Sequence, residues 1–141
     1  MSFKITHPYN ALYVYSIDDE SHRGAYKIGK STVRARSAES LTPNCEELNQ
    51  AAHKTIYSQT HRAAIAYKLE YTDVCFYRSE DGDENGFWDH DVHAYLEKMG
   101  KSKRIFPNVV GEPDEWYECM LDDIKVAIAG IKAGWTAPRP T

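Results

Sequence analysis

The sequence predicts a small α+β domain, in which helices flank a three-stranded, mostly antiparallel sheet. Two tyrosine-rich segments joined by a polar turn near the N-terminus predict a hairpin, and a third alternating segment follows in mid-chain. Apolar residues recur at helical spacing in three other stretches. With 141 residues, the chain is long enough for one domain with a hydrophobic core.

The strands of this sheet are expected at residues 12–17, 25–30 and 65–76, where tyrosine and β-branched residues alternate with polar ones. The third segment changes phase at residues 72–73, and this predicts a bulge or corner there. Residues 80–86 are acidic and contain glycine, which predicts a loop.

Three helices are expected between and after these strands. The Thr-Pro pair that opens residues 42–58 is a typical helix start. The second helix would begin at Asp89 or Asp91 and end before a glycine. The third is expected over residues 121–132, with two acids in its first turn. Between the last two helices, residues 115–119 are expected to be extended.

The domain boundaries follow from these elements. Residues 1–10 are expected to be an N-terminal lead-in, because Pro8 interrupts regular structure. A single domain would span residues 11–134. Residues 135–141 contain two prolines and are expected to be a tail or linker.

Composition narrows the functional classes. The net charge of −4 disfavours a general nucleic-acid-binding surface. Basic residues nevertheless gather at residues 27–36 and 98–104, so a local basic groove and ordinary solvated faces both stay open. Three widely spaced cysteines favour a reducing, cytoplasmic setting. Neither a signal peptide nor a membrane-spanning run is expected.

Two short motifs carry a resemblance to a known family. Residues 11–13, Ala-Leu-Tyr, and residues 27–29, Lys-Ile-Gly, resemble the two half-motifs of the GIY-YIG nuclease superfamily. The chain is most similar to the branch whose second half-motif begins with Lys, which includes phage-type proteins and modules of helicase-like restriction proteins. Residues 89–93 and 115–117 resemble the acid–histidine and Glu-Trp-aromatic segments of that branch. The resemblance covers residues 11–132 and implies a GIY-YIG-like fold.

The resemblance implies a catalytic pair, Tyr13 and Lys27, that face one another across the hairpin. Tyr13 would orient or deprotonate a water molecule, and Lys27 would supply a nearby positive charge. Arg36, or else Arg34, would clamp the scissile phosphate, because a guanidinium fork fits phosphate geometry. The family has its arginine on or just before the first helix, and here both arginines precede that helix. The alternative is a half-buried strand tyrosine beside solvated basic side chains.

A second part of the site is implied on the second helix. Asp89 stands where the family has a metal-binding Glu, and it would bind one Mg²⁺ or Mn²⁺ through its carboxylate. His93, one turn later, would orient that shell or contact the phosphate. Alternatively, Asp89 is an N-cap, or Asp91 takes either role. His90 and His93 are spaced as a zinc pair, but no other Cys or His supports zinc.

Five further residues are expected to contact nucleic acid, and the resemblance and the basic clusters together suggest them: Lys30, His53, Lys101, Lys103 and Arg104. The expected function is a metal-dependent endonuclease that hydrolyses DNA phosphodiester bonds by attack of water. Its expected partners are DNA and a helicase-like protein or fusion. The alternative is a degraded nucleic-acid-binding or protein-interaction module on the same fold. A nuclease would require Tyr13, Lys27, one arginine and Asp89 to converge on one concave surface.

Overall fold

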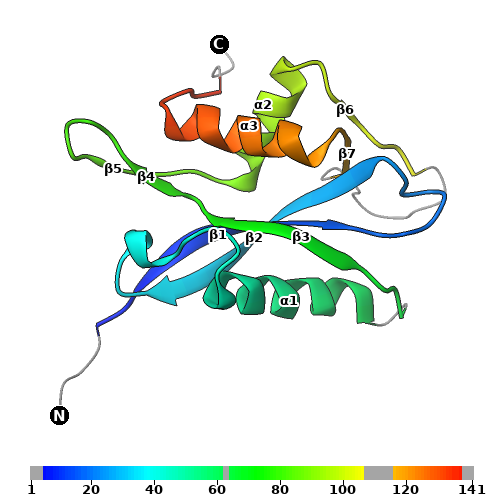
Figure 1. The fold of residues 1–141 in the computed structure, drawn as a ribbon, viewed down its shortest axis with the longest axis horizontal. Helices are drawn as coiled ribbons and strands as arrows, with labels where there is room; N and C mark the ends of the chain where they lie inside the picture. The colour runs from blue at the N-terminus through cyan, green and yellow to red at the C-terminus, as the bar shows by residue number, and fades with distance from the viewer. Residues whose placement is uncertain (1–4, 62–63, 107–115, 138–141) are drawn as a thin grey trace.

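The structure is a computed structural model that describes residues 5–61, 64–106 and 116–137. The elements, in chain order, are β1 (His7–Ser16), β2 (Ala25–Ala35), the 3-10 turn η1 (Ala38–Ser40), α1 (Glu46–Thr60), β3 (Lys68–Val74), β4 (Phe76–Arg78), β5 (Glu84–Gly86), α2 (Asp89–Lys98), β6 (Ser102–Lys103), β7 (Trp116–Glu118) and α3 (Leu121–Lys132). A central sheet lies between α1 on one face and the α2–α3 pair on the other (Figure 1). The predicted α+β class is therefore confirmed.

The sheet has more strands than the sequence predicts. Over the described residues it has five antiparallel strands in the order β3-β1-β2-β7-β6, and β4 and β5 form a separate hairpin. The three expected strands form its centre and one edge. β7 corresponds to the extended segment expected at residues 115–119. β6 and β5 are two and three residues long, too short to show a periodic pattern in the sequence.

Alternation along β1 divides the core between the two helical layers. Tyr13 and Tyr15 pack on the α1 face with Ala52 of α1. Leu12 and Val14 point to the other face, where they pack with residues of α2 and α3. Successive side chains of a strand point to opposite faces, so one strand supplies both halves of the core.

β1 and β2 are both longer than the hairpin that the sequence predicts. β1 begins at His7, so the expected lead-in is partly strand. Pro8 fits there because β1 pairs with β3 only from Ala11 onward, which leaves Pro8 at a locally unpaired edge. β2 continues to Ala35 with strictly alternating burial after Gly29. The predicted end of this strand at residue 30 is therefore wrong.

α1 begins at Glu46, three residues after the predicted first helical residue, Pro43, and ends at Thr60. The residues before it form a turn that docks on β3. Asn44 has a φ of 63°, its side-chain oxygen accepts a hydrogen bond from the Thr72 amide at 2.9 Å, and its own amide donates to the Thr72 carbonyl at 2.9 Å. This left-handed residue interrupts the helical backbone, so the helix cannot start at Pro43.

The other two helices agree with the sequence. α2 begins at Asp89, and α3 spans residues 121–132 as predicted. The Asp91 carboxylate accepts a hydrogen bond from the Trp88 amide at 2.9 Å and caps α2. Gly100 has a φ of +85° just past the end of the helix. None of the described helices is long and apolar enough to cross a membrane.

A register shift and a buried ion pair shape the other edge of the sheet. The shift lies in the β1–β3 pairing between Val14 and Tyr15, a few residues from the predicted bulge at residues 72–73. Asp73 is buried, and the Lys132 ammonium at the end of α3 lies 2.9 Å from its carboxylate. Trp135, expected in a tail, packs edge-on against Tyr95 of α2 with ring centroids 4.9 Å apart.

Candidate active site

Tyr13 lies flat against a glycine of the neighbouring strand. The β1–β2 register places Tyr13 directly opposite Gly29. A Cβ atom built on Gly29 would lie less than 3.0 Å from the hydroxyl oxygen and two ring carbons of Tyr13. Glycine is therefore required at this position so that the aromatic ring can lie on the backbone of β2. The hydroxyl accepts a hydrogen bond from the Gln59 side-chain amide of α1 at 2.9 Å.

Lys27 lies on the same face of β2 as Tyr13, but the two do not stand directly opposite one another. Tyr15 is the residue opposite Lys27, and Tyr13 is its diagonal neighbour. The predicted face-to-face pairing is thus corrected by one step of the ladder, because the turn length sets a register that the sequence pattern leaves open. A diagonal separation is still within the reach of long side chains.

His93 of α2 reaches the backbone of β2 from the other helical layer. Its Nε2 lies 2.9 Å from the carbonyl oxygen of Ile28, and the side chain is buried. Because a carbonyl oxygen can only accept, Nε2 carries the proton and donates it. The ring also stacks on Tyr117 of β7 with centroids 5.1 Å apart. Ile28 is joined to Gly29, so His93 and Tyr13 contact the same stretch of β2.

Within the described part of the chain, this stretch lies at a sheet edge. Among the described residues, β2 pairs with β7 only over residues 25–27, so the side of Ile28 and Gly29 that faces away from β1 has no strand beside it. The His93 imidazole occupies that side at Ile28. Tyr13 approaches this segment from the α1 layer and His93 from the α2 layer.

Asp89 and His90 complete a cluster with His93 at the start of α2. One ligand atom from each of the three side chains lies within 4.8 Å of the other two. Asp89 is 1% exposed, and neither of its carboxylate oxygens has a hydrogen-bond partner among the described residues. His90 is exposed, and its ring meets that of His93 edge-on with centroids 5.6 Å apart.

We call Tyr13, Lys27, Asp89, His90 and His93 the β2-edge site. It combines a hydroxyl, an ammonium group, a carboxylate and two imidazoles around one backbone segment. Such a set can bind a divalent cation, transfer protons and stabilise negative charge. The expected convergence of Tyr13, Lys27, one arginine and Asp89 on one concave surface is not seen among the described residues, because Tyr13 and Lys27 lie on the α1 face of the sheet, whereas Asp89 belongs to α2 on the other face.

The exposed rim of the β2-edge site is formed by Lys30 and Trp88. The Lys30 ammonium lies 4.2 Å from the centre of the Trp88 ring, and both side chains are exposed. The two residues are sequence neighbours of Gly29 and Asp89 respectively. The expected nucleic-acid contact of Lys30 is therefore compatible with its position beside the site, where a cation and an aromatic face suit a phosphate and a base.

The structure does not bring the two candidate arginines to this site. β2 continues past Gly29 for six more residues, and a strand rises about 3.3 Å per residue, so Arg34 and Arg36 lie about 17 Å or more away. Arg34 instead donates hydrogen bonds to the hydroxyl and carbonyl oxygens of Thr6, at 3.1 and 2.8 Å. The predicted phosphate clamp is corrected because the strand is longer than expected.

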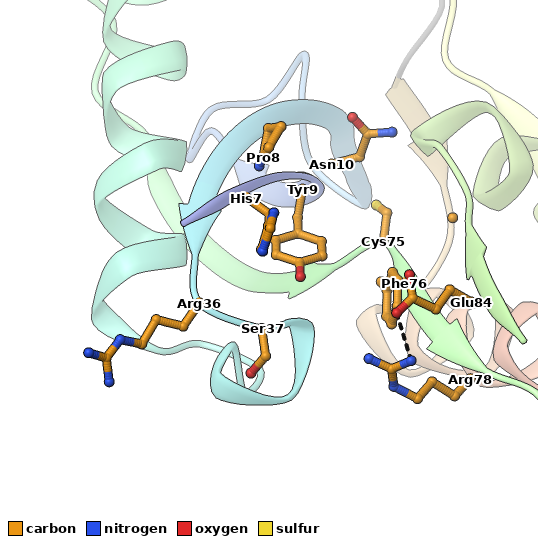
Figure 2. Close-up of a pocket in the computed structure, with 11 residues that line it drawn as sticks. His7, Pro8, Tyr9, Asn10, Arg36, Ser37, Cys75, Phe76, Arg78 and Glu84 are labelled. Atoms are coloured by element: carbon orange, nitrogen blue, oxygen red, sulfur yellow. Dashed lines mark hydrogen bonds and ion pairs between the residues drawn. The ribbon is translucent and has the colours of Figure 1, made fainter. Parts of the chain in front are cut away.

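Arg36 lines a separate pocket of about 560 Å³ at the far end of the β1–β2 hairpin. Figure 2 shows its side chain extending away from Tyr9 and Ser37, which line the same pocket. On the opposite wall, Arg78 forms ion pairs with Glu84 at 2.8 Å and with Glu39. The β2-edge site residues are not among those that line this pocket.

The C-terminal basic residues predicted to contact nucleic acid are paired with acids. The Lys101 ammonium lies 3.4 Å from Asp123, and the Arg104 guanidinium lies 2.6 Å from Glu118. Arg104 also donates to the carbonyl oxygens of Ser21 and Arg23, each at 2.8 Å. These partners show that Arg104 ties β6 to the β1–β2 turn.

Two remaining predicted contacts are similarly engaged. The Lys103 ammonium lies 3.9 Å from the Glu97 carboxylate. His53 Nδ1 lies 2.5 Å from the Tyr67 hydroxyl, on the α1 face. Exposed pairs of this kind contribute little to stability, so their partners do not prevent a phosphate from replacing them. No continuous basic patch follows from these residues.

Burial and nearby carboxylates raise the pKa values of two cysteine thiols. Burial raises the pKa of the Cys75 thiol well above its usual value, and the carboxylates of Asp73 and Asp89 raise it further. Burial also raises the pKa of Cys119 to about 12. Neither thiol is therefore suited to act as a nucleophile near neutral pH.

Sequence reasoning missed two members of this arrangement. No local sequence pattern predicts Gln59, because its contact with Tyr13 depends on how α1 docks on the sheet. The sequence predicts His90 only as half of a zinc pair. Its signal was present in the Asp-His-x-x-His spacing, which places Asp89 beside the two histidines on the first turn of one helix.

Comparison of the chain with known protein families, with curated proteins and with solved structures gave no match.

Proposed function

We propose that this protein is a metal-dependent endonuclease of the GIY-YIG type that hydrolyses DNA phosphodiester bonds by attack of water. One observation carries the proposal: Tyr13 and His93 contact the same stretch of β2, and Asp89 lies beside His93. The proposal is supported by the presence of the kinds of group that phosphodiester hydrolysis needs on the two sides of this stretch, a proton acceptor on the α1 side and a cation ligand on the α2 side.

The residues present fit a divalent cation. A buried carboxylate with no hydrogen-bond partner is costly, and the two Asp89 oxygens are in that state among the described residues. A bound cation would offset this cost. Asp89 would hold Mg²⁺ or Mn²⁺, which would supply Lewis-acid stabilisation of charge on the phosphate oxygens.

The other residues of the β2-edge site act on the water and on the phosphate. Tyr13, held by the Gln59 amide, would orient the attacking water or accept its proton. Lys27, on the same face, would contribute positive charge beside the phenolic oxygen and the phosphate. His93, fixed by its hydrogen bond to Ile28, would keep its ring aligned with the Asp89 carboxylate.

Substrate must approach from the exposed rim. Tyr13 and Asp89 are each 1% exposed, whereas Lys30 and His90 are exposed. A DNA strand that binds along the rim would place a phosphate near the Lys30 ammonium and a base near Trp88.

A cleavage assay tests the proposal. Supercoiled plasmid DNA is incubated with the protein and Mg²⁺ or Mn²⁺, and nicked and linear products are measured. Tyr13→Phe and Asp89→Asn should each abolish most of the cleavage. Tyr57→Phe, an exposed tyrosine of α1, and Asp122→Asn, an exposed acid in the first turn of α3, are matched controls that should cleave like wild type. Cleavage unchanged in both site variants would reject the proposal.

A second candidate is a nucleic-acid-binding or protein-interaction module on the same fold. The position of Arg34 and Arg36, about 17 Å or more from Gly29 along β2, favours it, because neither guanidinium can stabilise charge at the β2-edge site. This candidate predicts that the protein binds DNA in a gel-shift assay but does not cleave it with any divalent metal. Loss of DNA binding in Lys30→Ala, with cleavage absent throughout, would support the module.

A further inference from the structure

We propose that Asp89, His90 and His93 form a three-ligand site that prefers a first-row transition ion, such as Zn²⁺ or Co²⁺, over Mg²⁺. The inference rests on the proposed function, because it assigns the metal of that same site. Binding of the ion nevertheless requires only these three side chains and can be measured whether or not DNA is cleaved.

The chemistry of the donor set points to this class of ion. Two imidazole nitrogens and one carboxylate oxygen suit Zn²⁺, Co²⁺ and similar ions, whereas Mg²⁺ prefers oxygen ligands and retains several waters. Three protein ligands also leave a coordination position for water or substrate, as in catalytic zinc sites. A site with one carboxylate ligand and no imidazole would discriminate much less strongly between these transition ions and Mg²⁺.

The spacing of the ligand atoms fits one ion. The three atoms lie within 4.8 Å of one another, and two ligands on a tetrahedral zinc ion are about 3.3 Å apart. Asp89 and His93 lie one helical turn apart on α2, so they share a face. His90 is exposed, and rotation of its side chain can close the remaining separation without disturbing the core.

The surroundings of His93 resemble those of metal-binding histidines. Metal ligands of this type donate their second ring N–H to a carbonyl or carboxylate, which fixes the tautomer and the ring orientation. His93 donates from Nε2 to the Ile28 carbonyl at 2.9 Å. In the neutral ring the lone pair then lies on Nδ1, which is the nitrogen that would bind a metal. The hydrogen bond also fastens the proposed metal site to β2, next to Gly29.

Asp89 provides an independent observation. Its side chain is more than nine-tenths buried, and both oxygens lack a hydrogen-bond partner among the described residues. The neighbouring acid, Asp91, is occupied because it accepts the hydrogen bond that caps α2. Asp89 is therefore the carboxylate of this turn that is placed to bind an ion together with the histidines.

Metal binding can be measured without DNA. The protein is first stripped with a chelator and then titrated with Co²⁺, while d–d absorption in the visible range reports coordination by nitrogen and oxygen. We expect saturable binding of one Co²⁺, displacement by Zn²⁺ and no displacement by excess Mg²⁺. Asp89→Asn and His90→Ala should each weaken Co²⁺ binding at least about tenfold.

Matched variants separate this effect from misfolding. His90 is exposed and Asn is isosteric with Asp, so both site variants should keep the circular dichroism spectrum of wild type. Asp122→Asn and His61→Ala, an exposed histidine just after α1, should bind Co²⁺ like wild type. Equal Co²⁺ affinity in wild type and His90→Ala, or displacement of Co²⁺ by Mg²⁺, would overturn the inference.

Two outcomes distinguish a failure of the transition-metal inference from a failure of the nuclease proposal. If DNA cleavage is lost in Asp89→Asn while Co²⁺ binding is unchanged, the transition-metal inference is wrong and the nuclease proposal stands. If Co²⁺ binding is lost in the site variants but no metal supports cleavage by wild type, the metal site stands and the nuclease proposal is wrong.

Discussion

The phenolic end of Tyr13 and the imidazole of His93 contact the same peptide unit, the one that joins Ile28 to Gly29. Tyr13 lies against the α-carbon of Gly29 from the α1 layer, and His93 holds the Ile28 carbonyl from the α2 layer. One segment of β2 therefore connects the two halves of the β2-edge site.

Replacement of Gly29 by alanine should disturb both the fold and the site. The added Cβ overlaps the Tyr13 ring, which must shift, and overpacking of this kind typically costs about 1–3 kcal/mol of unfolding free energy. Urea unfolding measures this loss, and DNA cleavage should fall with it. Gly86→Ala in β5 is the control, because a Cβ atom there would lie 3.8 Å from the Cys75 carbonyl oxygen, which is an ordinary contact. Equal stability of Gly29→Ala and wild type would contradict the ring position.

Removal of the Gln59 amide should release the Tyr13 hydroxyl. Gln59→Ala deletes the hydrogen bond to Tyr13 and a longer one, 3.4 Å, from Tyr15, and we expect a loss of about 0.5–1.5 kcal/mol in unfolding free energy. Cleavage should also slow, because Tyr13 is no longer held in place. Gln50→Ala on the same helix should change neither quantity, since Gln50 is exposed and its side-chain amide donates to Glu46 in its own helix. Equal unfolding free energies and equal cleavage rates in Gln59→Ala and Gln50→Ala would show that Gln59 does not hold Tyr13 in place.

Arginine substitution tests the main correction to the sequence-based site. Arg36→Ala should leave the single-turnover cleavage rate unchanged, because Arg36 lies beyond the far end of β2. Arg34→Ala should keep that rate too, with at most a small loss of stability from its bonds to Thr6. A large fall in the cleavage rate for either variant would show that an arginine reaches the site after all.

Stability should decline in strongly alkaline solution. Burial and the nearby Asp73 carboxylate raise the pKa of Tyr71 from 10.0 to about 12. Because the folded state keeps the proton to higher pH, its stabilising effect is complete below pH 10 and is lost as the pH rises through about 12. Urea midpoints measured between these pH values should fall for wild type. Tyr71→Phe should show a smaller fall, and an equal fall would assign the effect to other groups.

The sequence predicts correctly those parts of the fold that carry local signals. α2 and α3 were located correctly because acids in their first turns and glycines after their ends are visible in the sequence. The far half of β2 was missed although Ser31, Val33 and Ala35 alternate with exposed residues, because the short polar side chains weaken the hydrophobic pattern. Because the predicted strand ends at residue 30, Arg34 and Arg36 are expected near the site, whereas the longer β2 carries both arginines away from it.

The site itself was only partly predictable. Tyr13, Lys27, Asp89 and His93 could be named from motif spacing, but spacing does not set the cross-strand register that puts Gly29 opposite Tyr13. The role of Gln59 depends on tertiary docking of α1, which no local pattern encodes. His93 was predicted to act on the metal or the phosphate, and its contact with the Ile28 carbonyl emerged only from the packing of α2 beside β2.

The most direct test of the central claim is a double-mutant cycle on the single-turnover rate of DNA cleavage, with Tyr13→Phe, Asp89→Asn and the variant that carries both. If both residues serve one chemical step, each single substitution should slow cleavage by about 100-fold or more, and the double variant should be little slower than the slower single variant. Cleavage at the wild-type rate in the double variant would contradict the claim that the β2-edge site is where DNA is hydrolysed.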